Sequence, residues 1–528
     1  MIRHLPFFLI FFIIQSNLHS QVVQEWVQRF ENPPNGVYNV AGVNVDNQGN
    51  VFVSGSMSDA ALTDYVTIKY NSAGVQQWAR IYSGPIEDKV IDMALDNFGN
   101  VLITGLSENQ TGTFDIITIK YNTLGDSLWV RRYNGENAFA MDQPVAMDID
   151  VNNNIYVSGY SFGASPMNYV TIKYSPDGDS LWIARYPSGG TDIPTDIYVD
   201  DAGNVYVYGG GALILKYTPD GNFLWDKTYP IEAAESNKIL CGDSNGNIFF
   251  AGIKSTATFG DFAVVKINSE GDTLWMRIYN GLGNGETNHD NPAAITIDNN
   301  DNVILTGKSS NLSSNYFSTI KYSAGGVFLW ERIYSNPQNG EGGADILTDN
   351  AGNIYVAGGS NAFTTIKYNS NGDSLWAMIY NGPSNMLDIP SAMTIDNLGN
   401  IYVAGRSQHS GSAIFFDIVT LKYSQTTTAI SQENNPVSNY RLYQNYPNPF
   451  NPKTIINYEL GITNFTSLKI FNILGKEIAT LVNEVQNAGS YSIEWDASDN
   501  PSGIYFCILR AESASGIFSE AKRMILLK

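Results

Sequence analysis

Apolar and polar side chains alternate over short stretches through most of the chain, and turn-forming residues separate each stretch from the next. Segments such as VAMDID, NIYVSG, VTIKY and LWIARY have the period of two that is typical of β-strands with one buried face. The DNxGN sequence between the first two segments supplies the Asp, Asn and Gly that a tight hairpin needs. The pattern predicts successive antiparallel strands, here called A to D, and an all-β fold.

The hairpin sequence recurs eight times, at intervals of 43 to 55 residues. Its copies begin at Asp46, Asp96, Asp150, Asp200, Asp243, Asp298, Asp349 and Asp396. This interval is close to that of four-stranded propeller blades. The first strand D tryptophan, Trp26, precedes every other blade element, and the last repeat ends at Tyr423 without one. We therefore predict an eight-bladed β-propeller whose N-terminal strand completes the last blade and so removes a free sheet edge.

These segments, in the order GNVYVSG, NYVTIKY and LWxxRYNG, resemble the bacterial β-propeller repeats known as SBBP repeats, over about residues 24–424. The resemblance implies a propeller. The family name refers to seven blades, whereas eight repeats are counted in this chain.

A polar stretch, SQTTTAISQENNPVSN, follows the last repeat and predicts a linker. About seven short strand-like segments after it predict a small β-sandwich. The sequence carries YPNPFNP (Tyr446–Pro452), LKIFNILGKEI, Gly489 with Tyr491, Trp495-Asp496, Gly503–Tyr505 and a basic end, Lys522–Lys528. These features resemble the type A C-terminal sorting domain of the type IX secretion system. The resemblance implies export to the periplasm, recognition by the secretion machinery of the outer membrane, and release or attachment at the cell surface.

Residues 1–20 have the positive start and short apolar run of a signal peptide. The predicted organisation is a signal peptide at 1–20, a propeller at 21–424, a linker at 425–440 and a sorting domain at 441–528. The formal charge of -21 argues against a nucleic-acid partner. No later apolar stretch is long enough to cross a bilayer. We expect a monomer that is secreted or attached to the outer-membrane surface.

An acidic residue recurs just before strand A, where the connections between repeats are long and varied. The residues are Asp88, Asp142, Asp192, Asp290 and Asp388, with Glu341 in a similar place. If strand A lines a central channel, their carboxylates could gather at its mouth and hold Ca²⁺. The alternative is that each aspartate caps a turn and is exposed to water. By contrast, we expect the strand C lysine, the hairpin aspartate and the strand D tryptophan to be structural, because each recurs in every repeat.

Two classes of function remain. The first is a non-enzymatic binding or adhesion module whose variable loops bind a carbohydrate or a protein. The second is a secreted enzyme that acts on glycans or uses a quinone cofactor. No adjacent cysteine pair supports the quinone hypothesis, and no single carboxylate pair stands out for hydrolysis. No catalytic or cofactor-binding residue is assigned.

Overall fold

The computed structural model describes residues 22–528 apart from 32–35, 59–61, 136–140, 163–166, 188–192, 235, 237, 256–259, 282–289, 312–313, 335–341, 410–414, 426–440, 444, 446, 461–463, 474–475, 488 and 514–515. They form two compact units that divide between Thr428 and Ala429. No helix among them is both long and apolar enough to cross a membrane. The predicted signal peptide and nearly all of the predicted linker lie outside the described residues.

The described residues of the first unit form eight antiparallel sheets, numbered here in chain order. Sheet 1 contains β2 (Val37–Val45), β3 (Val51–Ser58), β4 (Thr63–Tyr70) and β5 (Gln76–Tyr82). Sheet 2 contains β6 (Asp88–Leu95), β7 (Val101–Glu108), β8 (Phe114–Tyr121) and β9 (Ser127–Tyr133). Sheet 3 contains β10 (Asp142–Ile149), β11 (Ile155–Phe162), β12 (Met167–Tyr174) and β13 (Ser180–Pro187). Sheet 4 contains β14 (Pro194–Val199), β15 (Val205–Gly209), the 3-10 turn η1 (Gly210–Ala212), β16 (Leu213–Tyr217) and β17 (Phe223–Thr228).

Sheet 5 has a divided first strand and contains β18 (Glu232–Ala233), β19 (Leu240–Gly242), β20 (Ile248–Ser255), β21 (Gly260–Ile267) and β22 (Thr273–Tyr279). Sheet 6 contains β23 (Asn291–Ile297), β24 (Val303–Asn311), β25 (Ser314–Tyr322) and β26 (Phe328–Tyr334). Sheet 7 contains β27 (Gly343–Thr348), β28 (Ile354–Gly358), β29 (Phe363–Tyr368) and β30 (Ser374–Tyr380). Sheet 8 contains β31 (Asp388–Ile395), β32 (Ile401–Gln408), β33 (Phe416–Gln425) and β1 (Val22–Phe30).

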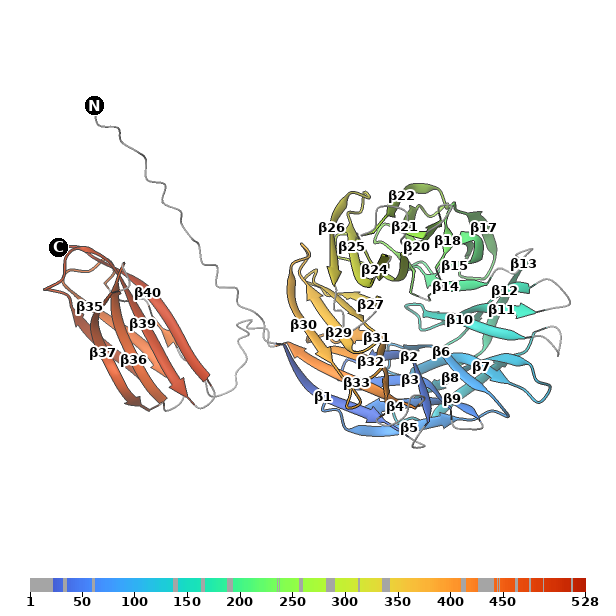
Figure 1. Cartoon of the computed structure of the whole chain (residues 1–528), viewed down its shortest axis with the longest axis horizontal. Helices are drawn as coiled ribbons and strands as arrows, with labels where there is room; N and C mark the ends of the chain where they lie inside the picture. The colour runs from blue at the N-terminus through green and yellow to red at the C-terminus, as the bar shows by residue number, and fades with distance from the viewer. Residues whose placement is uncertain are drawn as a thin grey trace, which may run out of the picture. The chain divides into compact units, whose positions relative to one another are not determined.

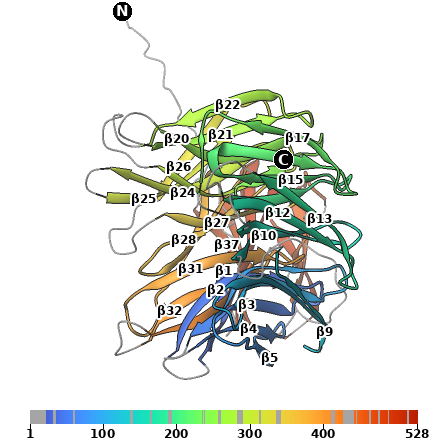
Figure 2. The same cartoon turned by 90° about the vertical axis from the view of Figure 1, so that its right-hand side faces the viewer.

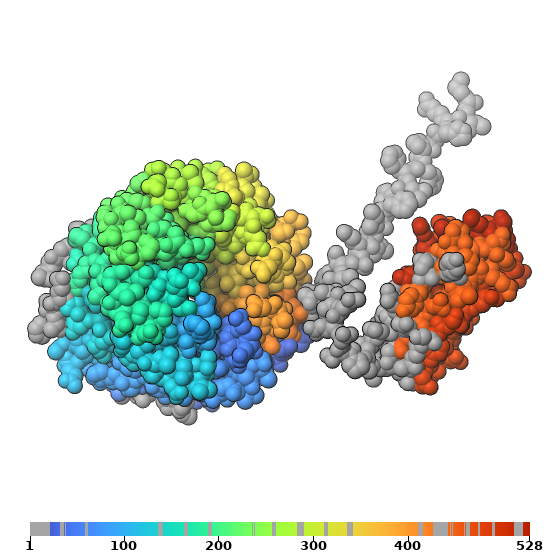
Figure 3. Space-filling view, turned by 180° about the vertical axis from the view of Figure 1, so that it is seen from behind, coloured from blue at the N-terminus to red at the C-terminus, as the bar shows by residue number. Residues whose placement is uncertain are grey.

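The sheets surround a common centre, with strand A of each sheet nearest to it and strand D outermost (Figure 1). Figure 2 shows the same ring on edge, and Figure 3 shows its opposite face. Because neighbouring strands are antiparallel, the A–B and C–D turns lie on one face, called the turn face. The D–A and B–C connections lie on the other, called the loop face.

Each A–B turn is closed by its own aspartate. Asp46 Oδ1 accepts hydrogen bonds from the backbone N–H groups of Gln48 (2.9 Å) and Asn50 (2.8 Å), and Asp46 Oδ2 accepts one from the Asn50 amide (2.7 Å). Gly49 has a φ of 77°, which glycine adopts without steric cost. The same three bonds occur at Asp96, Asp150, Asp243, Asp298, Asp349 and Asp396. The predicted structural role of these aspartates is confirmed.

The strand C lysine and strand D tryptophan join each sheet to the next. Lys120 Nζ and Trp129 Nε1 both donate to the carbonyl oxygen of Pro176 in the C–D turn of sheet 3, at 2.9 and 3.1 Å. Lys120 also pairs with Asp96 at 2.9 Å. In the same way other Lys–Trp pairs share the carbonyls of Thr123, Pro219, Ser269, Ala324 and Ser370. The repeated lysines and tryptophans are therefore structural, as predicted.

The strand around Trp26 completes sheet 8, as the offset of the tryptophans predicts. β1 pairs antiparallel with β33, and Trp26 lies opposite Lys422. Trp26 Nε1 and Lys422 Nζ both donate to the carbonyl oxygen of Ser72 in sheet 1, at 3.2 and 3.3 Å. The pair of bonds that joins sheets 1 to 7 in succession thus also joins sheet 8 to sheet 1.

The junction between sheets 7 and 8 differs from the others. Since β1 comes from the other end of the chain, no C–D turn follows β33 to offer its carbonyl. Lys367 Nζ donates instead to the side-chain oxygen of Gln425 at 2.5 Å. The buried Trp376 Nε1 has no hydrogen-bond acceptor among the described residues.

The described residues of the second unit form two sheets. One contains β34 (Arg441–Leu442), β35 (Lys453–Leu460) and β38 (Gly489–Asp496), and the other contains β36 (Asn464–Asn472), β37 (Glu477–Gln486), β39 (Gly503–Ser513) and β40 (Gly516–Leu526). Side chains from both sheets, including Trp495 and Leu509, form one buried cluster. Phe450 of the YPNPFNP sequence joins it, with its ring centroid 5.5 Å from that of Trp495.

Candidate functional site

Four of the five predicted metal-binding aspartates are described, and all four are buried, with 1% or less of the residue exposed. Each accepts a backbone N–H from a glycine in the preceding D–A connection. The pairs are Gly84 with Asp88, Gly135 with Asp142 at 2.7 Å, Gly281 with Asp290 at 2.9 Å and Gly382 with Asp388 at 2.6 Å. The aspartates therefore cap turns, but the expected exposure to water is wrong. Asp192 and Glu341 lie outside the described residues.

A serine of strand B completes this arrangement, which we call the Gly-Asp-Ser clasp. Ser107 and Ser407 lie directly opposite Asp88 and Asp388 in the register, and Ser309 Oγ donates to Asp290 at 2.5 Å. Burial raises the pKa of Asp88, Asp142 and Asp388. Among the described residues no three His, Cys, Asp or Glu side chains are grouped to hold a metal ion, so the Ca²⁺ site stays a prediction.

The clasp leaves no room for a side chain at its glycine. A Cβ added to Gly382 would lie 2.7 Å from Asp388 Oδ1 and would also overlap Ser407 Oγ, whereas one added to Gly325 would lie 3.9 Å from its nearest neighbour. We expect Gly382→Ala to lower the free energy of unfolding by about 2 kcal/mol and Gly325→Ala to change it by less than about 0.5 kcal/mol. Urea unfolding followed by tryptophan fluorescence measures both. Equal effects of the two substitutions would contradict the clasp.

A second set of aspartates, which the repeat pattern did not indicate, joins the inner strands. Asp92 Oδ2 accepts the N–H of Met147 in the next sheet at 2.9 Å, and Asp148 Oδ2 accepts that of Val199 at 2.7 Å. Asp196 and Asp345 reach the following sheets in the same way. Burial raises the pKa of Asp92 to about 6 and that of Asp148 to about 7. Asp92 and Asp148 lie in the strand A segments VIDMALD and VAMDID. Their hydrogen-bond partners could not be predicted from these segments, because each partner lies in a neighbouring sheet.

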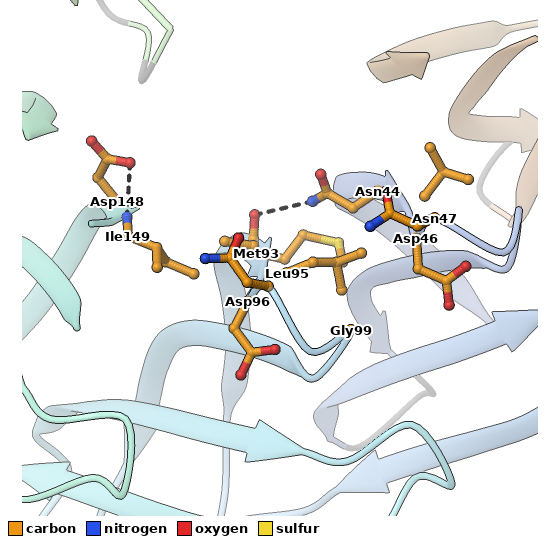
Figure 4. Close-up of a pocket in the computed structure, with 12 residues that line it drawn as sticks. Asn44, Asp46, Asn47, Met93, Leu95, Asp96, Gly99, Asp148 and Ile149 are labelled. Atoms are coloured by element: carbon orange, nitrogen blue, oxygen red, sulfur yellow. Dashed lines mark hydrogen bonds between the residues drawn. The ribbon is translucent and has the colours of Figure 1, made fainter. Parts of the chain in front are cut away.

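Two cavities lie at opposite ends of the inner strands. The cavity on the turn face has a volume of about 570 Å³ and is lined by carboxylates and amides, among them Asp46, Asp96 and Asp148 (Figure 4). The cavity on the loop face has a volume of about 260 Å³ and contains Lys89 and Lys238. The two ends therefore differ in charge.

Lys238 reaches from sheet 5 to two other sheets. Its Nζ lies 2.7 Å from Asp345 Oδ2 in sheet 7 and donates to the carbonyl oxygen of Ser391 in sheet 8 at 3.2 Å. The loop-face cavity is lined by residues of sheets 1, 2, 5 and 8, and we call this space between the inner strands, into which Lys238 reaches, the channel. Nothing in the repeat pattern indicated this lysine, because the sequence before β19 departs from the other repeats.

Two family models match the chain. Residues 444–524 match the secretion system C-terminal sorting domain, and residues 380–411 match the β-propeller repeat called SBBP. A curated relative, an uncharacterized WD repeat-containing protein of Acanthamoeba polyphaga mimivirus, is 25% identical over a match that covers 28% of this chain. The chain spans only 14% of the length of that relative.

Several solved structures are similar to this chain. BamB from Moraxella catarrhalis matches with a TM-score of 0.46 and 12% identity, covering 76% of this chain and 99% of its own. PorZ, a surface component of the type IX secretion system of Porphyromonas gingivalis, matches with a TM-score of 0.34 and 14% identity, covering 92% of this chain and 74% of its own. At these values neither structure carries an argument about ligands.

The type IX sorting domain directs a protein to the cell surface or the outside of the cell. The chain is therefore a secreted SBBP-type β-propeller repeat protein that carries a C-terminal sorting domain of the type IX secretion system.

Proposed function

We propose that this protein is a non-enzymatic binding or adhesion module that holds a carbohydrate or protein ligand on its loop face. The observation that carries the proposal is that the polar side chains repeated from sheet to sheet are engaged in structural hydrogen bonds. Hairpin aspartates are occupied in closing their own turns, and strand C lysines and strand D tryptophans are occupied by bonds to the next sheet. The loop-face connections, by contrast, vary from one repeat to the next, and we propose that they contact the ligand.

We infer that the eight sheets are eight blades of a closed propeller at residues 21–424, and that a linker at 425–440 leads to a β-sandwich at 441–528. A signal peptide at 1–20 completes the proposed organisation. The bond from Trp26 to Ser72 supports closure, and the single buried cluster formed by the two C-terminal sheets supports the sandwich. We also propose that the mature protein is a monomer.

Site-directed shielding tests which face binds the ligand. A cysteine is introduced on the loop face, at the exposed Gln110 or Met386, or on the turn face, at Phe98 or Leu398. Each variant is coupled to polyethylene glycol through a maleimide. Burial raises the pKa of the native Cys241 and Cys507 thiols, so the introduced thiol reacts first.

The coupled proteins are applied to glycan and protein arrays with and without EDTA. We expect the loop-face conjugates to lose binding and the turn-face conjugates to keep it. The reverse pattern, or turnover of an array sugar, would contradict the proposal. Loss of binding in EDTA would support the predicted Ca²⁺ site.

A further inference from the structure

Seven of the eight inner strands carry a bulge with one extra residue in strand A, and three of these extra residues, Ala41, Ile91 and Ser391, line the loop-face cavity. In β6, for example, the register shifts between Val90 and Asp92, so that Ile91 is the extra residue. Sheet 5 has Lys238 at the corresponding place, directly before Ile239, whose carbonyl accepts the Ala251 N–H. The eight residues are Ala41, Ile91, Val145, Thr195, Lys238, Ala293, Ala344 and Ser391. All are half-buried, and only Lys238 is charged.

An insertion in sheet 5 positions this lysine. Five residues, 234–238, separate Ala233 from Ile239, whereas other inner strands have one residue at the bulge. The Ser236 hydroxyl donates to the Ala293 carbonyl at 2.6 Å, and the Lys238 carbonyl accepts the N–H of Ile295 at 2.8 Å. The Lys238 carbonyl accepts this N–H as Asp92 accepts the N–H of Met147 in sheet 3, so the insertion joins sheet 5 to sheet 6.

The loop-face cavity beside Lys238 presents hydrogen-bond donors. Lys238 uses two of its three ammonium protons on Asp345 and Ser391. Lys89 is exposed, and its ammonium has no hydrogen-bond or ion-pair partner among the described residues. The position of Lys89 is occupied by Asn39, Gln143, Ile193, Glu232, Asn291, Gly342 and Ile389 in the other sheets.

Asn39, in the same cavity, is oriented by a third cation. Arg406 Nη1 donates to Asn39 Oδ1 at 3.0 Å, so that the Asn39 NH₂ group is left as a donor. The guanidinium of Arg406 is itself held against the Phe416 ring, 5.0 Å from its centroid. Asn39, Lys89 and Lys238, from sheets 1, 2 and 5, are thus the side chains with nitrogen donors among the residues that line the cavity.

We propose that the loop-face cavity binds the anionic group of an acidic sugar, a carboxylate or a sulfate, at the mouth of the channel. This rests on the proposed function and names the ligand class. The Lys89 ammonium has no acceptor among the described residues, and an unpaired cationic donor suits an oxyanion. The volume of about 260 Å³ is below the roughly 300–1,000 Å³ that encloses drug-sized ligands, and it suits one sugar ring. The half-buried Ile91 and the channel-lining Ala41 offer an apolar surface to that ring.

Calorimetric titration of the full-length mature protein tests the proposal. The probes are an oligogalacturonate, a heparin oligosaccharide and a neutral maltooligosaccharide of equal length, with an oligoglutamate as a peptide anion. We expect the acidic sugars to bind and the neutral sugar not to bind. Binding of only one acidic sugar would identify the anionic group as carboxylate or sulfate. Affinity should fall as salt is raised.

Two variants, one in the cavity and one outside it, each remove one positive charge from the loop face. Lys89→Gln should weaken acidic-sugar binding about tenfold. The Lys254 ammonium is hydrogen-bonded to the Pro230 carbonyl. Lys254→Gln should therefore change the affinity for the acidic sugar less than about twofold. Matching unfolding midpoints show that both variants are folded.

The outcomes separate this proposal from the proposed function. Equal effects of the two variants would overturn the cavity site while glycan binding by the loop face survives. Binding of the neutral sugar alone would also overturn the cavity site and leave glycan binding by the loop face intact. Binding of oligoglutamate alone, with sensitivity to Lys89→Gln, would overturn the sugar class. If none of the probes binds, the acidic-sugar site is overturned, and the array experiment then decides the proposed function separately.

Discussion

A mature protein that begins after Glu31, and so lacks β1, is expected to lose cooperative unfolding and to aggregate. β1 pairs with β33 along its length, from Val22 to Phe30. Without it, β33 becomes an edge strand whose largely buried residues present unpaired N–H and C=O groups to solvent. The buried Asp417 also loses Arg29, its ion-pair partner at 2.7 Å. Any residual unfolding midpoint should be lower by at least about 10 °C.

Tryptophan fluorescence during heating and light scattering measure this effect. The control is rescue in trans: a synthetic peptide of residues 21–31, added to the truncated protein, should restore the midpoint and suppress scattering. A Trp26→Ala peptide should do so less well, because it lacks the indole N–H that donates to Ser72. An unchanged midpoint in the truncated protein would contradict closure by β1.

The second large effect is a loss of stability as pH rises from about 5 to 8. Burial raises the pKa of Asp92 to about 6 and that of Asp148 to about 7 in the folded protein, while an unfolded aspartate titrates near about 3.9. Between these values the folded state binds more protons than the unfolded state, so the stability present at low pH is lost as pH rises. Both side chains are half-buried, which limits the loss to about 1 to 2 kcal/mol for each.

Other buried aspartates act in the same direction, because burial also raises the pKa of Asp88, Asp142 and Asp388. We expect the unfolding midpoint to be lower at pH 8 than at pH 5 by roughly 5 °C. Differential scanning calorimetry across this range measures it. An Asp92→Asn, Asp148→Asn double variant should have a flatter pH profile, whatever its absolute midpoint. A wild-type midpoint that rises toward pH 8 would show that these carboxyls are not responsible.

Sequence alone determined the strands, the hairpins, the repeat and the pairing of the Trp26 strand with the Lys422 strand. These features were predictable because their causes are local: a side-chain period of two, turn residues at fixed offsets, and one tryptophan placed before the repeat begins. It also indicated the sorting domain, from a series of ordered motifs that the family model matches.

Only the tertiary structure decided where the polar side chains lie. Asp88 and Asp388 are capping residues, as one hypothesis held, but they are buried because the D–A connection folds back over them. Lys238 appeared in the sequence only as a break in the repeat. It lines the channel because the ring brings sheet 5 within reach of Asp345 in sheet 7, a contact that spans 107 residues. Such a contact depends on how sheets distant in sequence are placed around one axis, which no local pattern encodes.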